Sequence, residues 1–243
     1  VTYAETKEVP IENKEKTGSI TVHKTTEGQK NIEGIKFYLR GTSDSGRAID
    51  IPATTDKDGI AKFDGVPIGT YMVIEDKETV PYGYLVADEK EVKVEYAQTI
   101  DETILNNEQT GTVKVHKKTA DMTNVEGIRF ILSGISDTGR EIRIEATTDK
   151  DGLAKFEGVP VGTYTITEDG STVPYGYLVA DSKQVTVTYA QTVDADMFNE
   201  KVPDTPNTGS SDNDIDGRTA LGSIAIILAG AAFFMFSKKK KER

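Results

Sequence analysis

The chain has 243 residues, a net charge of −11 and 28 % charged residues, and it contains no cysteine and no tryptophan. This length allows one or two domains, and the acidity argues against nucleic-acid binding, which requires a basic face. Without cysteine, neither disulfides nor thiolate metal sites can stabilise the fold.

An internal repeat organises most of the chain. A shift of 93 residues aligns Gly18–Glu108 with Gly111–Lys201 without a gap, and about 55 of the aligned pairs are identical, including the run TVPYGYLVAD. The same shift aligns Val1–Gly18 with Val94–Gly111. Residues 1–17 are therefore expected to be the last strand of a truncated preceding repeat, and a signal peptide would lie upstream.

Each repeat has the pattern of an all-β domain. Short runs of alternating apolar and polar residues, such as SITVHK, TYMVIE and EVKVEYA, are separated by the turn sequences DSGR, DKDG, PIG and PYG. About seven strands in such a repeat predict a β-sandwich of the immunoglobulin or prealbumin kind. The expected domains are residues 18–108 and 111–201, with almost no linker between them.

Three polar residues extend the apolar faces of predicted strands, at equivalent places in both repeats, because residues i and i+2 of a strand share a face. They are Lys24, Glu75 and Asn106 in the first repeat, and Lys117, Glu168 and Asn199 in the second. One interpretation places them at strand ends that reach water. The other buries them together. Burial disfavours the charged forms of lysine and glutamate. A neutral amine beside an asparagine carboxamide, with a carboxyl group to polarise the carbonyl and shuttle protons, is set up for acyl transfer.

A strand ending in Lys, then Y-x-x-x-E and P-x-G-Y, then a closing strand ending in Asn, resembles the B-type repeats of Gram-positive collagen adhesins and related pilin domains. The resemblance implies a prealbumin-like sandwich with a spontaneous Lys–Asn isopeptide bond, assisted by the glutamate. It assigns the crosslinks Lys24–Asn106 and Lys117–Asn199, with Glu75 and Glu168 as the catalytic glutamates. Pro81 and Pro174 depart from the pilin pattern, since they stand six residues after the glutamate instead of four.

After Lys201 the composition changes. Residues 202–219 are a polar linker, residues 220–236 (ALGSIAIILAGAAFFMF) are apolar or small, and residues 237–243 are a basic tail. As a helix, residues 220–236 would be about 26 Å long against a hydrocarbon core of roughly 30 Å. They are predicted to form a transmembrane helix, with the basic tail in the cytoplasm.

The pentapeptide TPNTG precedes this span and comprises Thr205, Pro206, Asn207, Thr208 and Gly209. A proline-containing pentapeptide of this kind, before a hydrophobic span and a basic tail, resembles a cell-wall sorting signal. The resemblance implies that a sortase cleaves between Thr208 and Gly209 and transfers the Thr208 carboxyl to an amine of the wall precursor. Thr205 stands where leucine is usual.

These features together predict the stalk and anchor of a secreted surface adhesin, attached to the peptidoglycan of a Gram-positive bacterium, and not an enzyme acting on external substrates. The expected partners are a sortase, the peptidoglycan precursor, the membrane before sorting, and a host or environmental ligand bound by a region upstream. No cofactor is expected.

Two alternatives remain open from the sequence. A close one is a pilin subunit that a sortase joins to other pilin subunits, although no Y-P-K-N-like lysine motif is present. A more distant one is a carbohydrate-binding module that uses the tyrosines of the P-Y-G-Y loops, Tyr82, Tyr84, Tyr175 and Tyr177.

Other polar features are given structural interpretations. His23 and His116 are one position duplicated by the repeat, and they are predicted to lie on a solvated strand face without binding metal. The DKDG sequences at 56–59 and 149–152 resemble part of a calcium loop but lack the remaining ligands, so hairpin turns are expected. The acidic stretch Asp212–Asp216 is interpreted as solvated linker.

Overall fold

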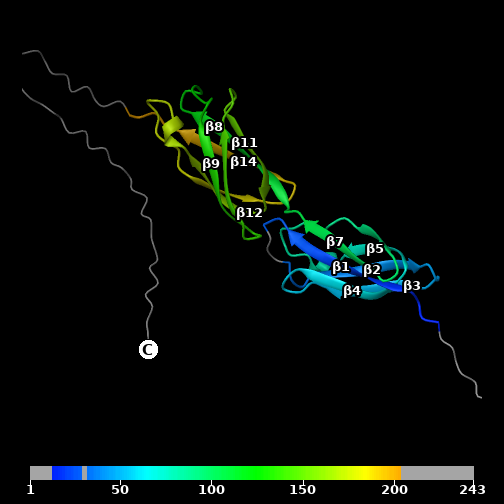
Figure 1. Ribbon diagram of the computed structural model, residues 1–243. Coiled ribbons are helices and arrows are strands. Elements are labelled where there is room, and N and C mark those ends of the chain that lie inside the picture. The colour runs from blue at the N-terminus through cyan, green and yellow to red at the C-terminus, as the bar shows by residue number, and fades with distance from the viewer. Residues whose placement is uncertain (1–12, 29–31, 204–243) are drawn as a thin grey trace, which may run out of the picture. The chain divides into compact units, whose positions relative to one another are not determined.

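Alternating apolar residues give each repeat seven strands in two sheets, as a computed structural model shows for residues 13–28 and 32–203 (Figure 1). In the first repeat the strands are β1 (Thr17–Thr26), β2 (Lys36–Ser43), β3 (Ala48–Thr54), β4 (Ile60–Pro67), β5 (Gly69–Glu75), β6 (Lys90–Val94) and β7 (Thr99–Asn106). One sheet has the order β4-β1-β7 and the other the order β3-β2-β5-β6. A short 3₁₀ turn, η1 (Lys77–Thr79), follows β5.

The second repeat has the same architecture. Its strands are β8 (Thr110–Thr119), β9 (Arg129–Ser136), β10 (Glu141–Thr147), β11 (Leu153–Pro160), β12 (Gly162–Glu168), β13 (Lys183–Val187) and β14 (Thr192–Asn199), with η2 (Gly170–Thr172) after β12. The sheet orders are β11-β8-β14 and β10-β9-β12-β13. The predicted all-β tandem sandwich is confirmed for the part of the chain that the structure describes.

The first and last strands of each repeat lie side by side and run parallel. Lys24 of β1 lies opposite Ile104 of β7, and the pairing ends with Thr26 opposite Asn106. In the second repeat Lys117 of β8 lies opposite Met197 of β14. Parallel strands need a long connection, and the five intervening strands of each repeat provide it. Residues about 80 positions apart in the sequence are thereby made neighbours.

Each repeat has its own apolar core between its two sheets. In β1, buried positions alternate strictly with half-buried ones, so that Ile20 and Val22 point into the core together with Phe37 and Tyr71. The same face of β1 continues to Lys24, which is also buried. The strand alternation therefore carries a charged side chain into the interior, where only a specific partner would offset the cost of desolvation.

The DKDG sequences differ from their expected role as hairpin turns. Asp56–Gly59 joins β3 to β4, and these strands belong to different sheets, so the turn crosses between the layers. Asp56 shapes this turn, since its Oδ1 accepts the backbone N–H groups of Asp58 and Ile60, each at 2.9 Å. The sequence correctly marks a turn here, but it does not state which strands pair.

Several predictions fall wholly or partly outside the described part of the chain: the preceding strand of residues 1–17, of which 1–12 are not described, the linker beyond residue 203, the motif at 205–209, the span 220–236 and the basic tail 237–243. Among the residues that are described, no helix has the length and apolarity needed to cross a membrane.

Candidate functional site

The amine of Lys24 lies in the interior near the end of the inner face of β1. Its side chain is fully buried, and Nζ donates to the backbone oxygen of Ile104 at 3.2 Å. Glu75 Oε1 lies 3.8 Å from Nζ. Burial lowers the pKa of the Lys24 amine to about 8, and the attraction of Glu75 opposes only part of this shift. The amine therefore loses its proton more readily than an exposed lysine does.

Glu75 is the last residue of β5 and reaches the same place from the opposite sheet. Its Oε2 accepts two hydrogen bonds of 2.8 Å, one from Nδ2 of Asn106 and one from the backbone N–H of Ala87. Its Oε1 faces Lys24. One carboxyl group thus contacts the amine with one oxygen and the carboxamide with the other.

Asn106 ends β7 and is completely buried. Both hydrogens of its side-chain amide have acceptors, because Nδ2 donates to Glu75 Oε2 and, at 2.6 Å, to the backbone oxygen of Leu85. The opposite orientation would place the amide oxygen against two acceptors, so these contacts fix the amide. Its Oδ1 has no hydrogen-bond partner among the described atoms.

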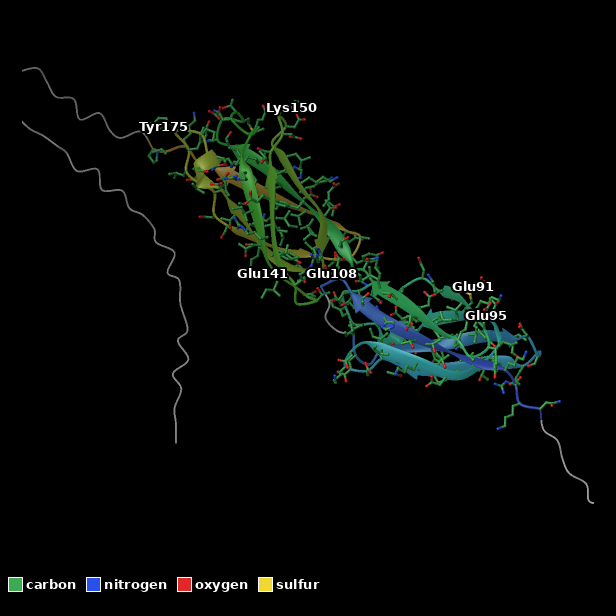
Figure 2. All side chains as sticks on the ribbon, in the orientation of Figure 1. Glu91, Glu95, Glu108, Glu141, Lys150 and Tyr175 are labelled. Carbon is green, nitrogen blue, oxygen red and sulfur yellow. The ribbon has the colours of Figure 1, made fainter. Side chains whose placement is uncertain are left out.

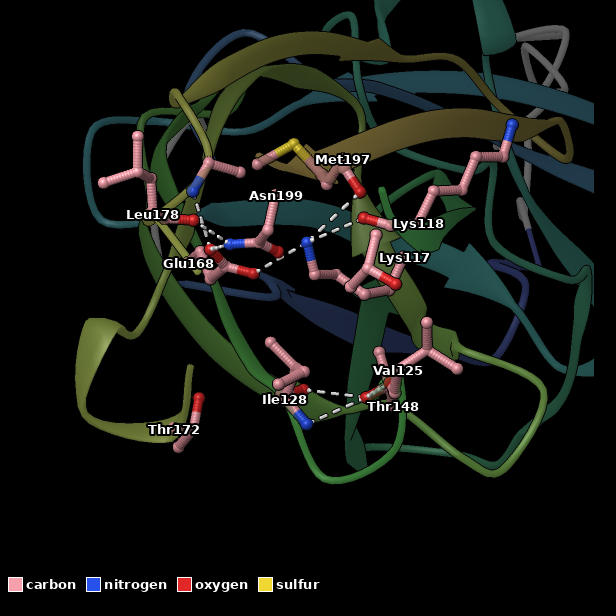
Figure 3. Close-up of polar contacts among 12 residues, drawn as sticks. Lys117, Lys118, Val125, Ile128, Thr148, Glu168, Thr172, Leu178, Met197 and Asn199 are labelled. Carbon is pink, nitrogen blue, oxygen red and sulfur yellow. Dashed lines mark hydrogen bonds and ion pairs between the residues drawn. The ribbon is translucent and has the colours of Figure 1, made fainter. Parts of the chain in front are cut away.

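The second repeat builds the same site with slightly closer contacts (Figure 3). Nζ of Lys117 lies 3.2 Å from Oε1 of Glu168, and Oε2 of Glu168 accepts from Nδ2 of Asn199 at 2.6 Å. Figure 3 shows these three side chains pointing toward one another. Burial lowers the pKa of the Lys117 amine as well. Oδ1 of Asn199, like that of its counterpart, lacks a partner among the described atoms.

A backbone segment that sequence reasoning missed completes each site. The segment after each P-Y-G-Y loop supplies one acceptor and one donor: the Leu85 oxygen and Ala87 N–H in the first repeat, and the Leu178 oxygen and Ala180 N–H in the second. These groups orient the asparagine amide and the glutamate through main-chain atoms. The only sequence signal for them is that the run PYGYLVAD is identical in both repeats.

The six predicted site residues thus form two buried Lys–Glu–Asn clusters, each at the ends of three strands. The expectation that Glu75 would polarise the asparagine carbonyl differs from the observed contact, since Glu75 binds the amide nitrogen instead. The carboxyl is therefore placed to exchange protons with the nitrogen that would leave, as well as with the lysine that would attack.

The other candidate residues lie elsewhere. His23 and His116 are on the outer strand face, where each pairs with an aspartate, Asp101 at 3.0 Å and Asp194 at 2.6 Å. Of the loop tyrosines, Tyr82 and Tyr175 are exposed, whereas Tyr84 is only 3 % exposed. A buried Tyr84 is not available as a binding platform for a sugar ring.

Comparison with known families found that a model of the SpaA prealbumin-like fold domain matches the chain twice, at residues 18–109 and 111–201. The two matches coincide with the two sandwiches. No curated protein matched the chain.

A solved structure shares this fold. The Bacillus anthracis TIE protein aligns with a TM-score of 0.56 and 24 % identity, over 77 % of this chain and 34 % of that protein. The chain thus spans about a third of that relative's length. The minor pilin of Streptococcus agalactiae aligns at 19 % identity over 80 % of this chain and all of the pilin, with a TM-score of 0.37. The shaft pilin SpaA of Lactobacillus rhamnosus GG aligns at 16 % identity over 78 % of this chain and all of that pilin, with a TM-score of 0.35.

Proposed function

This chain belongs to the SpaA family of prealbumin-like fold domains, and we propose that each of its repeats is a stalk domain closed by an internal isopeptide bond. The bonds would join Lys24 to Asn106 and Lys117 to Asn199. The observation that carries the proposal is the burial of an amine and a carboxamide on adjacent parallel strands, with one carboxyl group contacting both.

The reaction needs no external reagent. The neutral amine of Lys24 attacks Cγ of Asn106, a carbon–nitrogen bond forms, and the bond from Cγ to Nδ2 breaks. Glu75, which holds the proton that it shares with Lys24, delivers this proton to the leaving nitrogen, which departs as ammonia, and takes up the proton that the attacking nitrogen loses. The products are a secondary amide and one ammonia, so atoms and charge balance. Glu168 would serve Lys117 and Asn199 in the same way.

The role of the bond would be mechanical. It would enclose roughly 83 residues of each repeat, and the loop-entropy relation used for disulfides gives about 4.5 kcal/mol of stabilisation for a loop of that size. Such a bond does not depend on redox conditions, which suits a chain without cysteine.

The sequence after Lys201 supports anchoring to a cell wall. The TPNTG motif, the apolar residues 220–236 and the basic tail follow one another in the order of a sorting signal. We therefore propose that the two repeats form the stalk of a surface protein, which a sortase attaches through the carboxyl of Thr208. An amide-closed repeat would resist unfolding and proteolysis outside the cell.

The intact mass of residues 1–203 tests the proposal directly. This segment contains both sandwiches with their complete cores. Each closed bond removes one ammonia, about 17 Da, so we expect a mass about 34 Da below the encoded value. Peptide mapping should then recover Lys24 joined to Asn106 and Lys117 joined to Asn199. A mass equal to the encoded value in folded protein would contradict the proposal.

The rate of closure should depend on pH in a way that identifies the proton carrier. If Glu75 delivers a proton, the reactive form of the Lys24–Glu75 pair holds one shared proton. Because the pKa of Lys24 is lowered to about 8, the pair keeps this proton below pH 8 and loses it above. Closure should therefore slow above pH 8.

Chain synthesised without cells and held in urea, then diluted into folding buffers between pH 6.5 and 9.5, would give this profile from its mass over time. Variants in which only one repeat can close would assign the profile to that repeat. A rate that continues to rise above pH 8 would show that the neutral amine alone limits closure.

A further inference from the structure

Glu108, which lies between β7 and β8, is a buried acid outside the Lys–Glu–Asn clusters (Figure 2). Its side chain has no exposed surface. The carboxylate accepts hydrogen bonds from the Thr138 hydroxyl and, at 2.5 Å, from the guanidinium of Arg140, both in the turn region between β9 and β10. A buried carboxylate with a charged donor and a hydroxyl donor is a specific contact, because breaking it leaves an uncompensated charge.

The backbone at Glu108 is held by the first repeat. Its N–H donates to Oε2 of Glu27 at 3.1 Å, and the next residue, Gln109, donates its N–H to the Gly83 oxygen at 2.7 Å. The Gln109 oxygen in turn accepts from the N–H of Val161 in the second repeat, at 2.9 Å. Glu108 and Gln109, which lie between the strands of the two sandwiches, are thus bonded to both of them.

The chain carries a matching acid one repeat earlier. Glu15, which precedes β1, lies 93 positions before Glu108 and contacts Arg47 at 3.1 Å and Ser45 at 2.5 Å. These two partners are the counterparts of Arg140 and Thr138. The acid before the first strand of a repeat, and the turn of that repeat that binds it, therefore occur in both repeats. We call this turn, which carries Ser45 and Arg47 or Thr138 and Arg140, the receiving turn.

At the equivalent position after the second repeat, a basic residue replaces the acid. Lys201 takes the place of Glu108 and pairs with Asp121 of its own repeat at 3.0 Å. Gly176, the counterpart of Gly83, has no atom of a described residue within 4 Å of where a Cβ would stand. A lysine cannot accept hydrogen bonds from an arginine and a hydroxyl. The end of the second repeat therefore lacks the group that a following receiving turn would bind.

We infer that Glu108, Thr138 and Arg140 form a latch that fixes consecutive repeats to each other, and that the turn carrying Thr138 and Arg140 is a docking surface for the end of another repeat of the same kind. The partner is recognised by an acid at the position of Glu108 and a close-packed glycine at the position of Gly83. Lys201 marks the second repeat as the last member of such a series. This inference is independent of whether the isopeptide bonds close.

Gly83 offers a sharp test with a matched control. A Cβ at Gly83 would lie 2.7 Å from Cγ2 of Thr138, which is too close for any real contact, whereas a Cβ at Gly176 would meet no atom within 4 Å among residues 13–28 and 32–203. Both glycines have nearly the same positive φ, 90° and 91°, so alanine strains the two loops equally. Gly83→Ala therefore differs from Gly176→Ala mainly by its clash with the second repeat.

The measurement is ¹⁵N relaxation of residues 1–203, read separately for each repeat. With the latch intact, both repeats should tumble as one body. In Gly83→Ala the rotational correlation time of each repeat should fall about twofold, toward that of a single repeat, whereas Gly176→Ala should match the wild type. Arg140→Ala should give the same fall, with Arg47→Ala as its control.

Two results would overturn the inference. If Gly83→Ala and Arg140→Ala both leave the correlation times unchanged, the latch does not couple the repeats. If Gly176→Ala lowers them as much as Gly83→Ala, loop strain is the cause. The intact masses of the same samples report separately on the isopeptide bonds.

Discussion

Replacing Glu75 with glutamine should reduce the ammonia loss of the protein from about 34 Da to about 17 Da relative to the encoded mass. The first repeat would stay open because an amide cannot take the proton from Lys24 or deliver one to the leaving nitrogen. The second repeat would still close through Glu168. Glu75→Gln combined with Glu168→Gln should abolish the loss entirely.

Glutamine is a better choice than alanine here. Removing one partner of a buried charged pair costs roughly 3–5 kcal/mol, so alanine could prevent folding. Glutamine keeps an oxygen that can accept from Asn106 and from Ala87. Glu91→Gln, at an exposed position of β6, is the surface control and should retain the full loss. A full loss in the double glutamine variant would show that neither glutamate takes part in closure.

The sequence predicts the burial of the cluster residues because strand alternation is a local property. Lys24 follows Ile20 and Val22 at spacings of two, and the structure buries all three. The parallel pairing of β1 with β7 is not local. Five strands separate them in the sequence, so no tight turn between them predicts that they pair. Only the resemblance to known repeats indicated that Lys24 and Asn106 would meet.

The contacts that sequence reasoning missed involve main-chain atoms or connect distant segments. The Leu85 oxygen that orients Asn106 is a backbone group, and its presence at the site depends on the path of the chain, not on the side chain of Leu85. Glu108 does leave a signal, since the 93-residue shift aligns it with Glu15 and then with Lys201. The change from glutamate to lysine at this position gains a meaning only from the structure, in which Arg140 binds the carboxylate of Glu108.

Under a stretching force, the closed protein should extend very little beyond its folded length. The chain enters each repeat through its first strand and leaves through its last, and these strands are parallel neighbours. A bond from Lys24 to Asn106 would carry the load directly from β1 to the end of β7, so the segment between them would never be stretched. Hydrogen bonds between the two strands would be shielded in the same way.

Single-molecule pulling on the ends of residues 1–203 measures this directly. An open repeat should release roughly 83 residues, which at about 3.4 Å per residue adds ~280 Å of contour length. We expect no such step for the wild type, one for Glu75→Gln and two for the double glutamine variant. Lys24→Arg should also give one step, because a guanidinium stays protonated and does not attack. Two long steps in the wild type would mean that force passes through β2–β6, and that neither repeat is closed.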